Sequence, residues 1–244
     1  MSKLYVLSDV HGFYNEMREA LDKAGFDPND KNSWLSSCGD EMDRGNQPLE
    51  VINYLMSLPR AIFVKGNHTT LMEELINRGY PLSHDWSNGT AQTVLDLAPT
   101  ANDWRVACAI AYDNTKPFFD KEINYFETAN YIFVHSFIPQ YYTKNQQLEF
   151  NPDWRHAHAS EWENARWGNP FELAEQGFLP DKTLVFGHFH ASWPRSKYEG
   201  KPEFGKGADF SPYYGNGYIG IDACTAYTHK VNVLVLEDDF KNDE

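Results

Sequence analysis

The sequence predicts an α/β fold, and three observations support this prediction. Short apolar runs typical of buried strands alternate with stretches whose apolar residues recur at helical spacing. This strand–loop–helix unit occurs three times in succession near the N-terminus. A polar motif directly follows each of the three strands, and open α/β sheets bind ligands at the carboxyl ends of their strands. The pattern therefore predicts the location of a candidate site as well as the fold.

The first half of the chain is expected to contain three strand–helix units and a helical insert. Gly25 is expected to end the first helix and Pro48 to begin the second, the positions where these residues are tolerated best. A chain of 244 residues suits one α/β domain, residues 1–244. Strands are expected at 3–8, 33–38 and 61–64, helices at 13–24, 48–55 and 71–76, and a helical cap or insert at about 80–118.

The second half has strand patterns at 131–134 and 184–186. Residues 218–222 and 230–236 are expected to form an antiparallel pair at the end of the chain. Residues 137–180 are rich in aromatics, for which we favour packing beneath a long loop over stacking on a substrate. Residues 193–217 are rich in glycine and proline, and we expect a loop there.

Composition excludes several classes of function. Apolar residues make up 41% of the chain, as in an ordinary globular protein. A net charge of −14 disfavours binding to nucleic acid or to anionic membranes. The apolar run Leu4–Leu7 is too short for a signal peptide or a membrane span. Cys38, Cys108 and Cys224 are widely spaced and form no CxxC motif, which favours a reduced, cytoplasmic protein; nothing in the sequence indicates an oligomeric state.

Five polar clusters carry the chemistry. The most specific is Gly39–Gly45, in which two aspartates lie three residues apart and Arg44 follows. A carboxylate at a strand end can ligate a metal, and an adjacent arginine can bind phosphate through two hydrogen bonds. Each cluster alone could be an ordinary turn, but five in one chain favour a metal site over separate surface features. The other four clusters are Asp9-Val10-His11-Gly12, Gly66-Asn67-His68, His135-Ser136 and Gly187-His188-Phe189-His190.

These clusters resemble the signature of the calcineurin-like metallophosphoesterases, specifically the phosphoprotein-phosphatase branch. That branch includes serine/threonine phosphatases, phage and bacterial protein phosphatases, and symmetrical diadenosine tetraphosphatases. Its pattern reads GDxHG, GDxxDRG, GNHE, a lone histidine and GH, and this chain has SDVHG, GDEMDRG, GNHT, HS and GHFH. The resemblance covers about residues 1–236, with departures at Ser8 and Thr69. It implies an αββα sandwich of two mixed sheets flanked by helices, with a helical or loop cap.

The resemblance also implies two divalent metal ions. Asp40 is expected to bridge them, and His190 is an additional candidate ligand because only part of the wider superfamily uses that position. A mixed carboxylate, amide and imidazole set suits small transition cations, so Mn²⁺ is expected, with Fe, Zn or Ni as alternatives. The full set of predicted ligands is Asp9, His11, Asp40, Asn67, His135, His188 and His190.

By the same resemblance, a water or hydroxide that bridges the metals attacks phosphorus directly. His68 is the expected general acid, and Asp43 is expected to orient its imidazole. Arg44 is expected to hold the phosphate oxygens. A second phosphate-binding arginine is expected between the last two histidine motifs, with Arg166 as the choice and Arg155 as the alternative.

The predicted function is hydrolysis of phosphomonoesters, either phosphorylated Ser, Thr or Tyr in a protein or small aryl and alkyl phosphates. Hydrolysis of dinucleoside polyphosphates is the alternative enzyme function. A non-catalytic, metal-dependent scaffold is the alternative of a different class. The sequence disfavours the scaffold because Asp43, Arg44 and His68 are all retained.

Overall fold

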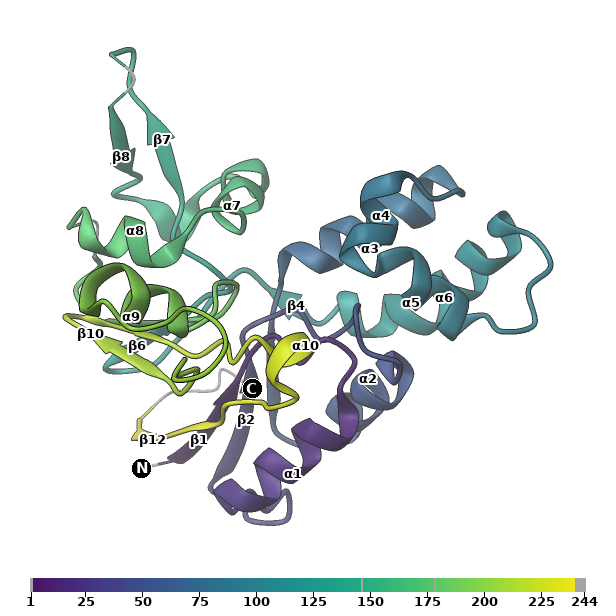
Figure 1. The fold of residues 1–244 in the computed structure, drawn as a ribbon, viewed down its shortest axis with the longest axis horizontal. Coiled ribbons are helices and arrows are strands. Elements are labelled where there is room, and N and C mark those ends of the chain that lie inside the picture. The colour runs from purple at the N-terminus through teal and green to yellow at the C-terminus, as the bar shows by residue number, and fades with distance from the viewer. Residues whose placement is uncertain (1, 146, 178, 240–244) are drawn as a thin grey trace.

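The computed structural model describes residues 2–145, 147–177 and 179–239. Its core is a pair of five-stranded sheets packed against each other, with helices on their outer faces (Figure 1). Leu4 and Val6 of the first sheet lie in one buried cluster with Phe133 and Val185 of the second. The predicted sandwich of two mixed sheets flanked by helices is confirmed.

The first sheet has the strand order β12-β1-β2-β3-β4. Side chains alternate along β1, so that Leu4 and Val6 face the second sheet while Tyr5 and Leu7 face the helices. Neighbouring strands are parallel except for β12, which runs antiparallel to β1. The strands are β1 (Ser2–Leu7), β2 (Ser33–Ser37), β3 (Ala61–Val64), β4 (Glu122–Ile123) and β12 (Leu234–Asp238).

Three helices follow the first three strands as predicted. Met17 and Leu21 of the first helix, and Val51, Ile52 and Leu55 of the second, pack on the outer face of this sheet. Gly25 ends the first helix in the left-handed conformation, and Pro48 opens the second. The helices are α1 (Tyr14–Ala24), α2 (Pro48–Ser57) and α3 (Asn67–Arg78).

The expected helical insert lies between β3 and β4. Its helices bury Val94, Ala107 and Ala111 against Met72 and Leu75 of α3. The insert is thereby attached to the helix that carries two candidate site residues, Asn67 and His68. It consists of α4 (Ser83–Asn88), α5 (Thr90–Leu97) and α6 (Trp104–Phe119).

The second sheet has the order β10-β11-β9-β6-β5. Its three central strands are parallel, and each edge strand is antiparallel to its neighbour. Trp162 and Phe171 pack on its outer face against Ile132 and Phe186. These elements are β5 (Phe126–Glu127), β6 (Tyr131–Phe133), β9 (Thr183–Phe186), β10 (Tyr213–Gly215) and β11 (Tyr218–Gly220), with α7 (Ala159–Ala165) and α8 (Pro170–Glu175).

A two-stranded hairpin extends from this half, away from both sheets (Figure 1). It consists of β7 (Gln140–Tyr142) and β8 (Leu148–Phe150), and the short 3₁₀ helix η1 (Trp154–His156) follows it. Trp154 and Trp162 are buried, and the Tyr125 ring stacks on Trp162 with centroids 5.3 Å apart. These two tryptophans therefore have the packing role that the sequence favoured.

Two sequence-based predictions about the last 50 residues are wrong. Residues 218–222 and 230–236 do not pair with each other, because β11 belongs to the second sheet and β12 to the first. The chain crosses between the sheets through α10 (Thr225–Thr228). Residues 193–217 are not all loop, because they contain most of α9 (Ser192–Glu199) and all of β10. Pro194 lies in the first turn of α9, where a missing backbone donor costs little, and Gly200 ends the helix at φ 68°.

The structure also bears on the expectation of no membrane span. Within the described residues, no helix is both long enough and apolar enough to cross a bilayer.

Candidate metal and catalytic site

The five polar clusters converge at the carboxyl ends of strands from both sheets. Asp9 follows β1, Asp40 follows β2, and Asn67 begins the helix after β3. His135 follows β6 and His188 follows β9 in the second sheet. Five segments that are distant in the sequence therefore meet at one edge of the sandwich.

One group of ligand atoms contains Asp40, Asn67, His135 and His188. The Nε2 atom of His135 lies 2.7 Å from Oδ1 of Asn67, 3.2 Å from Nδ1 of His188 and 3.3 Å from Oδ2 of Asp40. Nδ1 of His188 lies 3.0 Å from the same Asn67 oxygen. These four residues are three of the predicted metal ligands plus the predicted bridge, Asp40.

A second group shares Asp40 and extends to the other side. Ligand atoms of His11, Asp40 and His68 lie within 4.8 Å of one another, as do those of Asp40, His135 and His188. Asp9 borders this group, with its Oδ1 3.9 Å from Nε2 of His11. Asp40 is thus the residue common to both groups, the position that a bridging carboxylate requires.

Backbone contacts fix the orientation of two histidines. Nδ1 of His11 donates to the carbonyl of Met42 at 2.9 Å, and Nδ1 of His135 donates to that of Cys38 at 2.8 Å. Each ring therefore turns its Nε2 atom toward the candidate metal position. Contacts of this kind commonly set the tautomer of a metal-ligating histidine.

The donor set fits divalent cations. Asp9, Asp40 and Asp43 are all buried at this edge. Burial and the negative charge of Asp222 raise the pKa of Asp9 well above its usual range, while burial and the charge of His135 lower the pKa of His188 to about 3. Crowded carboxylates and an uncharged imidazole are the environment in which a small divalent ion is bound favourably.

His68 lies beside these groups in the arrangement expected of a general acid. Nδ1 of His68 donates to Oδ2 of Asp43 at 2.6 Å, and the Thr90 hydroxyl donates to the same oxygen at 2.7 Å. Nε2 is therefore the nitrogen that can exchange a proton with the site. The helical insert contributes Thr90, so it takes part in orienting the Asp43–His68 pair.

Arg44 lies against both histidines of this side. Its two terminal nitrogens are 3.0 Å from Nε2 of His11 and 3.2 Å from Nε2 of His68. A guanidinium in this place can reach an anionic group bound between the metal ligands and the general acid.

Backbone strain is concentrated at the site. Among the described non-glycine residues, eight have positive φ, and six of these are candidate site residues. Such conformations persist only where the surrounding structure holds them, and they cluster at functional sites. Glycine is required nearby, because a Cβ on Gly66 would lie 2.1 Å from an Asp40 oxygen. The six residues are Asp9, His11, Asp40, Asp43, Arg44 and His188.

Arg166 and His190 have contacts outside the two ligand groups. Nη2 of Arg166 donates to Asn124 at 2.6 Å, although the nearby Gly168 carbonyl accepts a hydrogen bond from Ser136, which follows His135. His190 contacts Ser192 at 3.0 Å and Glu203 at 3.3 Å. Their assignments as phosphate-binding arginine and metal ligand stay predictions.

Arg155, the alternative arginine, is engaged elsewhere. Its Nε and Nη2 atoms each donate to Glu127 at 2.8 Å. The guanidinium also lies 4.3 Å from the centre of the Trp154 ring. This geometry favours Arg166 over Arg155 as the residue near the site.

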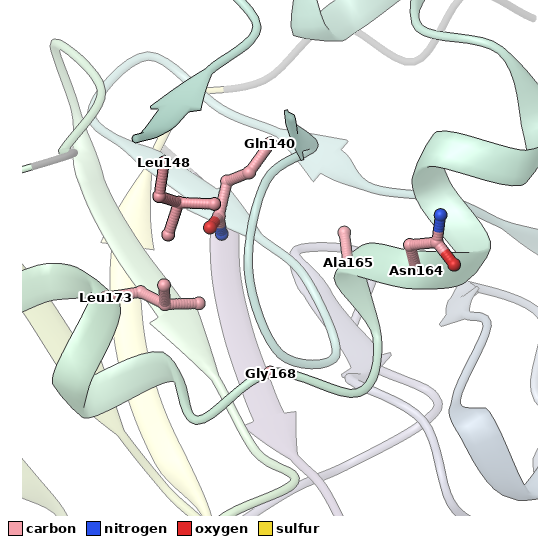
Figure 2. Close-up of a pocket in the computed structure, with 6 residues that line it drawn as sticks. All are labelled: Gln140, Leu148, Asn164, Ala165, Gly168 and Leu173. Atoms are coloured by element: carbon pink, nitrogen blue, oxygen red, sulfur yellow. The ribbon is translucent and has the colours of Figure 1, made fainter. Parts of the chain in front are cut away.

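A cavity of about 190 Å³ lies beside the segment that carries Arg166, because Asn164, Ala165 and Gly168 line it. Figure 2 shows Leu148 and Gln140 of the hairpin on one side of it and Asn164 and Ala165 on the other. Gly168 also lines it and connects it to the site, because the Gly168 carbonyl accepts a 2.7 Å hydrogen bond from Ser136. None of its lining residues is a candidate metal ligand, so it borders the site without being part of it.

Three residues that act on the site were not predicted as site residues. The Ser8 hydroxyl donates to Asp9 at 2.5 Å, and Thr90 binds Asp43. Asp222 is buried, and its charge raises the pKa of Asp9. A signal for Asp222 was present, since it is the last residue of an expected strand, close to the positions of Asp9 and Asp40 after theirs. Thr90 lies in the insert and had no such signal.

This fold and this arrangement of ligands define a metallophosphoesterase. Residues 2–192 match the family described as calcineurin-like phosphoesterase, so the chain belongs to that family. The predicted family and enzyme class, a hydrolase of phosphoesters, are confirmed.

Individual relatives give a more specific comparison. The chain is 48% identical over 65 residues to a symmetrical bis(5'-nucleosyl)-tetraphosphatase of Buchnera aphidicola, covering 26% of this chain and 23% of the relative. It is 32% identical over 123 residues to the enzyme of the same name from Aromatoleum aromaticum, covering 50% and 41%. The matched part of the chain thus spans less than half the length of these relatives.

A solved structure extends the comparison to nearly the whole fold. A crystal structure provisionally assigned as a diadenosine tetraphosphatase aligns with a TM-score of 0.59. The alignment covers 96% of this chain and 89% of the other at 16% sequence identity. At that identity the likeness concerns the fold alone.

Proposed function

We propose that this protein is a metal-dependent phosphatase that hydrolyses phosphomonoesters. The observation that carries the proposal is a pair of ligand groups sharing Asp40, with His68 and Arg44 directly beside them. The proposed substrates are a phosphorylated protein or a small aryl or alkyl phosphate.

Two divalent ions would be held by Asp9, His11 and Asp40 on one side and by Asp40, Asn67, His135 and His188 on the other. When bound, such ions supply charge neutralisation and activation of water at neutral pH. Mn²⁺ is the proposed metal, on the chemistry of the mixed oxygen and nitrogen donors.

The chain's own residues supply the remaining chemistry. Arg44 binds non-bridging phosphate oxygens and orients the ester. His68 donates a proton from Nε2 to the leaving oxygen, while Asp43 holds Nδ1 and stabilises the protonated ring. Thr90 fixes Asp43 in turn. Burial of these groups keeps water from competing for their hydrogen bonds.

Hydrolysis of a dinucleoside polyphosphate is the second candidate, favoured by the names of the matched relatives. The same groups can act on an anhydride, because the phosphate contacts and the protonated leaving oxygen are shared between the two reactions. The match to the Aromatoleum aromaticum enzyme covers 41% of that enzyme's sequence, so its activity is only a candidate for this chain.

One experiment tests the metal requirement and the substrate class together. Chelated protein should be inactive, and Mn²⁺ should restore activity better than Ca²⁺, which prefers all-oxygen sites. The restored enzyme is then assayed on phosphopeptides, aryl phosphates, phosphodiesters and diadenosine tetraphosphate. Release of phosphate from monoesters supports the proposal, and release of nucleoside diphosphate alone supports the second candidate. Full activity in excess chelator, with no metal found by elemental analysis, would refute both.

A further inference from the structure

The junction between α4 and α5 lies against the turn that carries Asp43 and Arg44. Gly89 ends α4, and Thr90 begins α5. The Thr90 hydroxyl donates to Oδ2 of Asp43 at 2.7 Å. A Cβ on Gly89 would lie 2.5 Å from the backbone nitrogen of Arg44 and 3.4 Å from its Cγ. Through these consecutive residues the helical insert therefore contacts both the partner of His68 and the candidate phosphate-binding arginine.

The side chain of Asp43 is held through one of its oxygens. Oδ2 accepts from Nδ1 of His68 at 2.6 Å as well as from Thr90. Oδ1 is buried and has no hydrogen-bond partner within the described residues. The terminal torsion of an aspartate is broad, so a carboxylate held through one oxygen needs a second contact to define its orientation. The Thr90 hydroxyl supplies that contact, and its loss would disturb the imidazole that Asp43 orients.

Backbone conformation makes Gly89 specific for its contact. Asp43 has φ 74° and Arg44 has φ 68°, conformations that persist only where neighbouring structure holds them. Gly89 has φ 90° and no side chain, so that its backbone approaches Arg44 directly. A residue with a Cβ at this position would have to displace the Arg44 backbone, because the atom that it meets is not the flexible end of a side chain.

The rest of the insert keeps this junction in place. Asp85 of α4 is fully buried and pairs with Arg78 at the end of α3. Val94 of α5 lies in one buried cluster with Met72 of α3. The other end of α3 carries His68. The junction and the general acid therefore belong to one packed unit, and catalytic groups held in this way keep the geometry that a reaction requires.

We propose that Gly89 and Thr90 are positioning residues of this site. Thr90 aligns the general acid His68 by way of Asp43, and Gly89 determines the place of Arg44 by direct backbone contact. This inference rests on the proposed phosphatase function. It assigns the helical insert separate effects on proton transfer to the leaving group and on phosphate binding.

Thr90 is tested by removing and then restoring its hydroxyl. Thr90→Val keeps a branched side chain without the hydroxyl, and Thr90→Ser keeps the hydroxyl and should behave as wild type. Thr115→Val is the matched control. Thr115 is fully buried in α6 of the same insert, and its hydroxyl donates to the Ala111 carbonyl at 2.8 Å, away from Asp43.

Gly89→Ala tests the backbone contact, and Gly79→Ala is its matched control. Gly79 ends α3 with φ 77°, so alanine is strained there as it is at Gly89. A Cβ on Gly79 would lie 3.5 Å from the Arg105 side chain, which is an ordinary contact distance. Both variants therefore carry the conformational strain, and only Gly89→Ala should displace Arg44.

Kinetics of the Mn²⁺-loaded full-length protein give the first readout. We expect Thr90→Val to lower kcat roughly ten-fold for an alkyl phosphate, because the hydrogen bond that it removes is to a charged group. The loss should be much smaller for p-nitrophenyl phosphate, whose leaving group needs no proton. KM and metal content should stay at the wild-type values.

Proton NMR of the Nδ1–H of His68 gives a readout that does not depend on turnover. Zn²⁺-loaded protein is used, because Mn²⁺ is paramagnetic and broadens nearby signals. The signal is identified by its absence in His68→Asn. It should shift in Thr90→Val and keep its wild-type position in Thr90→Ser and Thr115→Val.

Binding of inorganic phosphate, measured by calorimetry, tests Gly89. We expect Gly89→Ala to weaken phosphate binding on the order of ten-fold and to raise KM for both substrates, because Arg44 is displaced from the bound group. Gly79→Ala should leave phosphate affinity and KM unchanged.

The outcomes separate this inference from the proposed function. An unshifted His68 signal with wild-type kcat in Thr90→Val would overturn the role of Thr90, and so would the same changes in Thr115→Val. Wild-type phosphate affinity in Gly89→Ala, or an equal loss in Gly79→Ala, would overturn the role of Gly89. If Gly89→Ala does not fold, Gly89→Asn decides, because asparagine tolerates the left-handed conformation and carries the same Cβ. A wild-type protein that turns over no phosphoester would refute the proposed function, while the NMR signal and the phosphate titrations would still decide both roles.

Discussion

The two sheets contribute to the site in different ways. The loops of the first sheet supply most of the candidate residues from one short part of the chain, whereas the second sheet supplies His135 and His188, which lie far apart in the sequence. In its described part, the segment between those histidines contains the hairpin, η1, α7 and α8, and it supplies the residues that line the cavity beside Arg166. The first-sheet residues are Asp9, His11, Asp40, Asp43, Arg44, Asn67 and His68.

Backbone conformation shows the same contrast. Five of the six strained site residues belong to the first-sheet loops, and His188 is the sixth. Residues held in such conformations leave little freedom to vary. We infer that the first-sheet loops supply the general acid and the arginine that orients the ester, and that the second half, apart from its two candidate metal ligands, determines which substrate is preferred and how stable the domain is. The predictions below test this division, beginning with the largest expected effect.

Asp40→Asn should abolish metal binding and turnover together. Asp40 belongs to both ligand groups, and an amide cannot replace a carboxylate that serves two cations. Elemental analysis and hydrolysis of p-nitrophenyl phosphate give the two readouts. Asp120→Asn, on an exposed aspartate paired with Lys116, is the control and should change neither. Retention of both metals and full activity in Asp40→Asn would remove the basis for the shared site.

His68→Asn should slow the reaction while both metals remain bound. Loss of a general acid costs about 10²–10⁴-fold when the leaving group needs a proton. The loss should be much smaller for p-nitrophenyl phosphate, because p-nitrophenolate departs as an anion. Comparison of rates for p-nitrophenyl and alkyl phosphates measures this difference. Equal losses for the two leaving groups would show that His68 is not the acid.

The contrast between the halves also explains what the sequence could predict. In the first half, each motif is contiguous and follows a strand, so Asp9, Asp40 and Asn67 could be placed at one edge from spacing alone. In the second half, β11 and β12 look like a hairpin pair, yet they enter different sheets, because a long-range choice of partner leaves no local pattern. Thr90 had no signal either, since its role depends on a contact with Asp43, which lies far away in the sequence.

Arg166→Ala should reduce the preference for monoesters over diesters. A monoester dianion offers three oxygens to the metals and two arginines, and a diester has one of these oxygens alkylated. A charge-assisted contact is worth about 1.5–3 kcal/mol, so the ratio of kcat/KM values should fall roughly ten-fold. p-Nitrophenyl phosphate and bis-p-nitrophenyl phosphate measure that ratio. An unchanged ratio would mean that Arg166 does not bind the phosphate, and diester preference in the wild type would contradict the proposed monoesterase.

Glu127→Gln should affect stability and leave catalysis intact. Hydrogen bonds from Arg155 and Lys182 lower the pKa of Glu127 from 4.5 to about 2, despite partial burial. A carboxylate whose pKa is lower in the folded state stabilises the protein fully above its unfolded pKa, and this contribution is lost as pH falls toward 2. The side chain is 21% exposed and its partner Arg155 is 35% exposed, so solvent screening limits the effect to about 1 kcal/mol. For a chain of this size that corresponds to a decrease in Tm of about 2–4 °C near neutral pH.

Thermal unfolding of wild type and Glu127→Gln between about pH 3 and pH 7 measures this effect. The difference in Tm should be greatest above about pH 4.5 and shrink at lower pH, because the wild-type carboxylate then becomes protonated in the unfolded chain. High salt should also reduce the difference, since the pair is partly exposed. A difference in Tm that does not depend on pH would assign the loss to packing instead of charge. A fall in kcat/KM in Glu127→Gln would contradict the division of roles between the two halves. A charge pair in the second half, distant from the candidate ligands, would then affect the reaction.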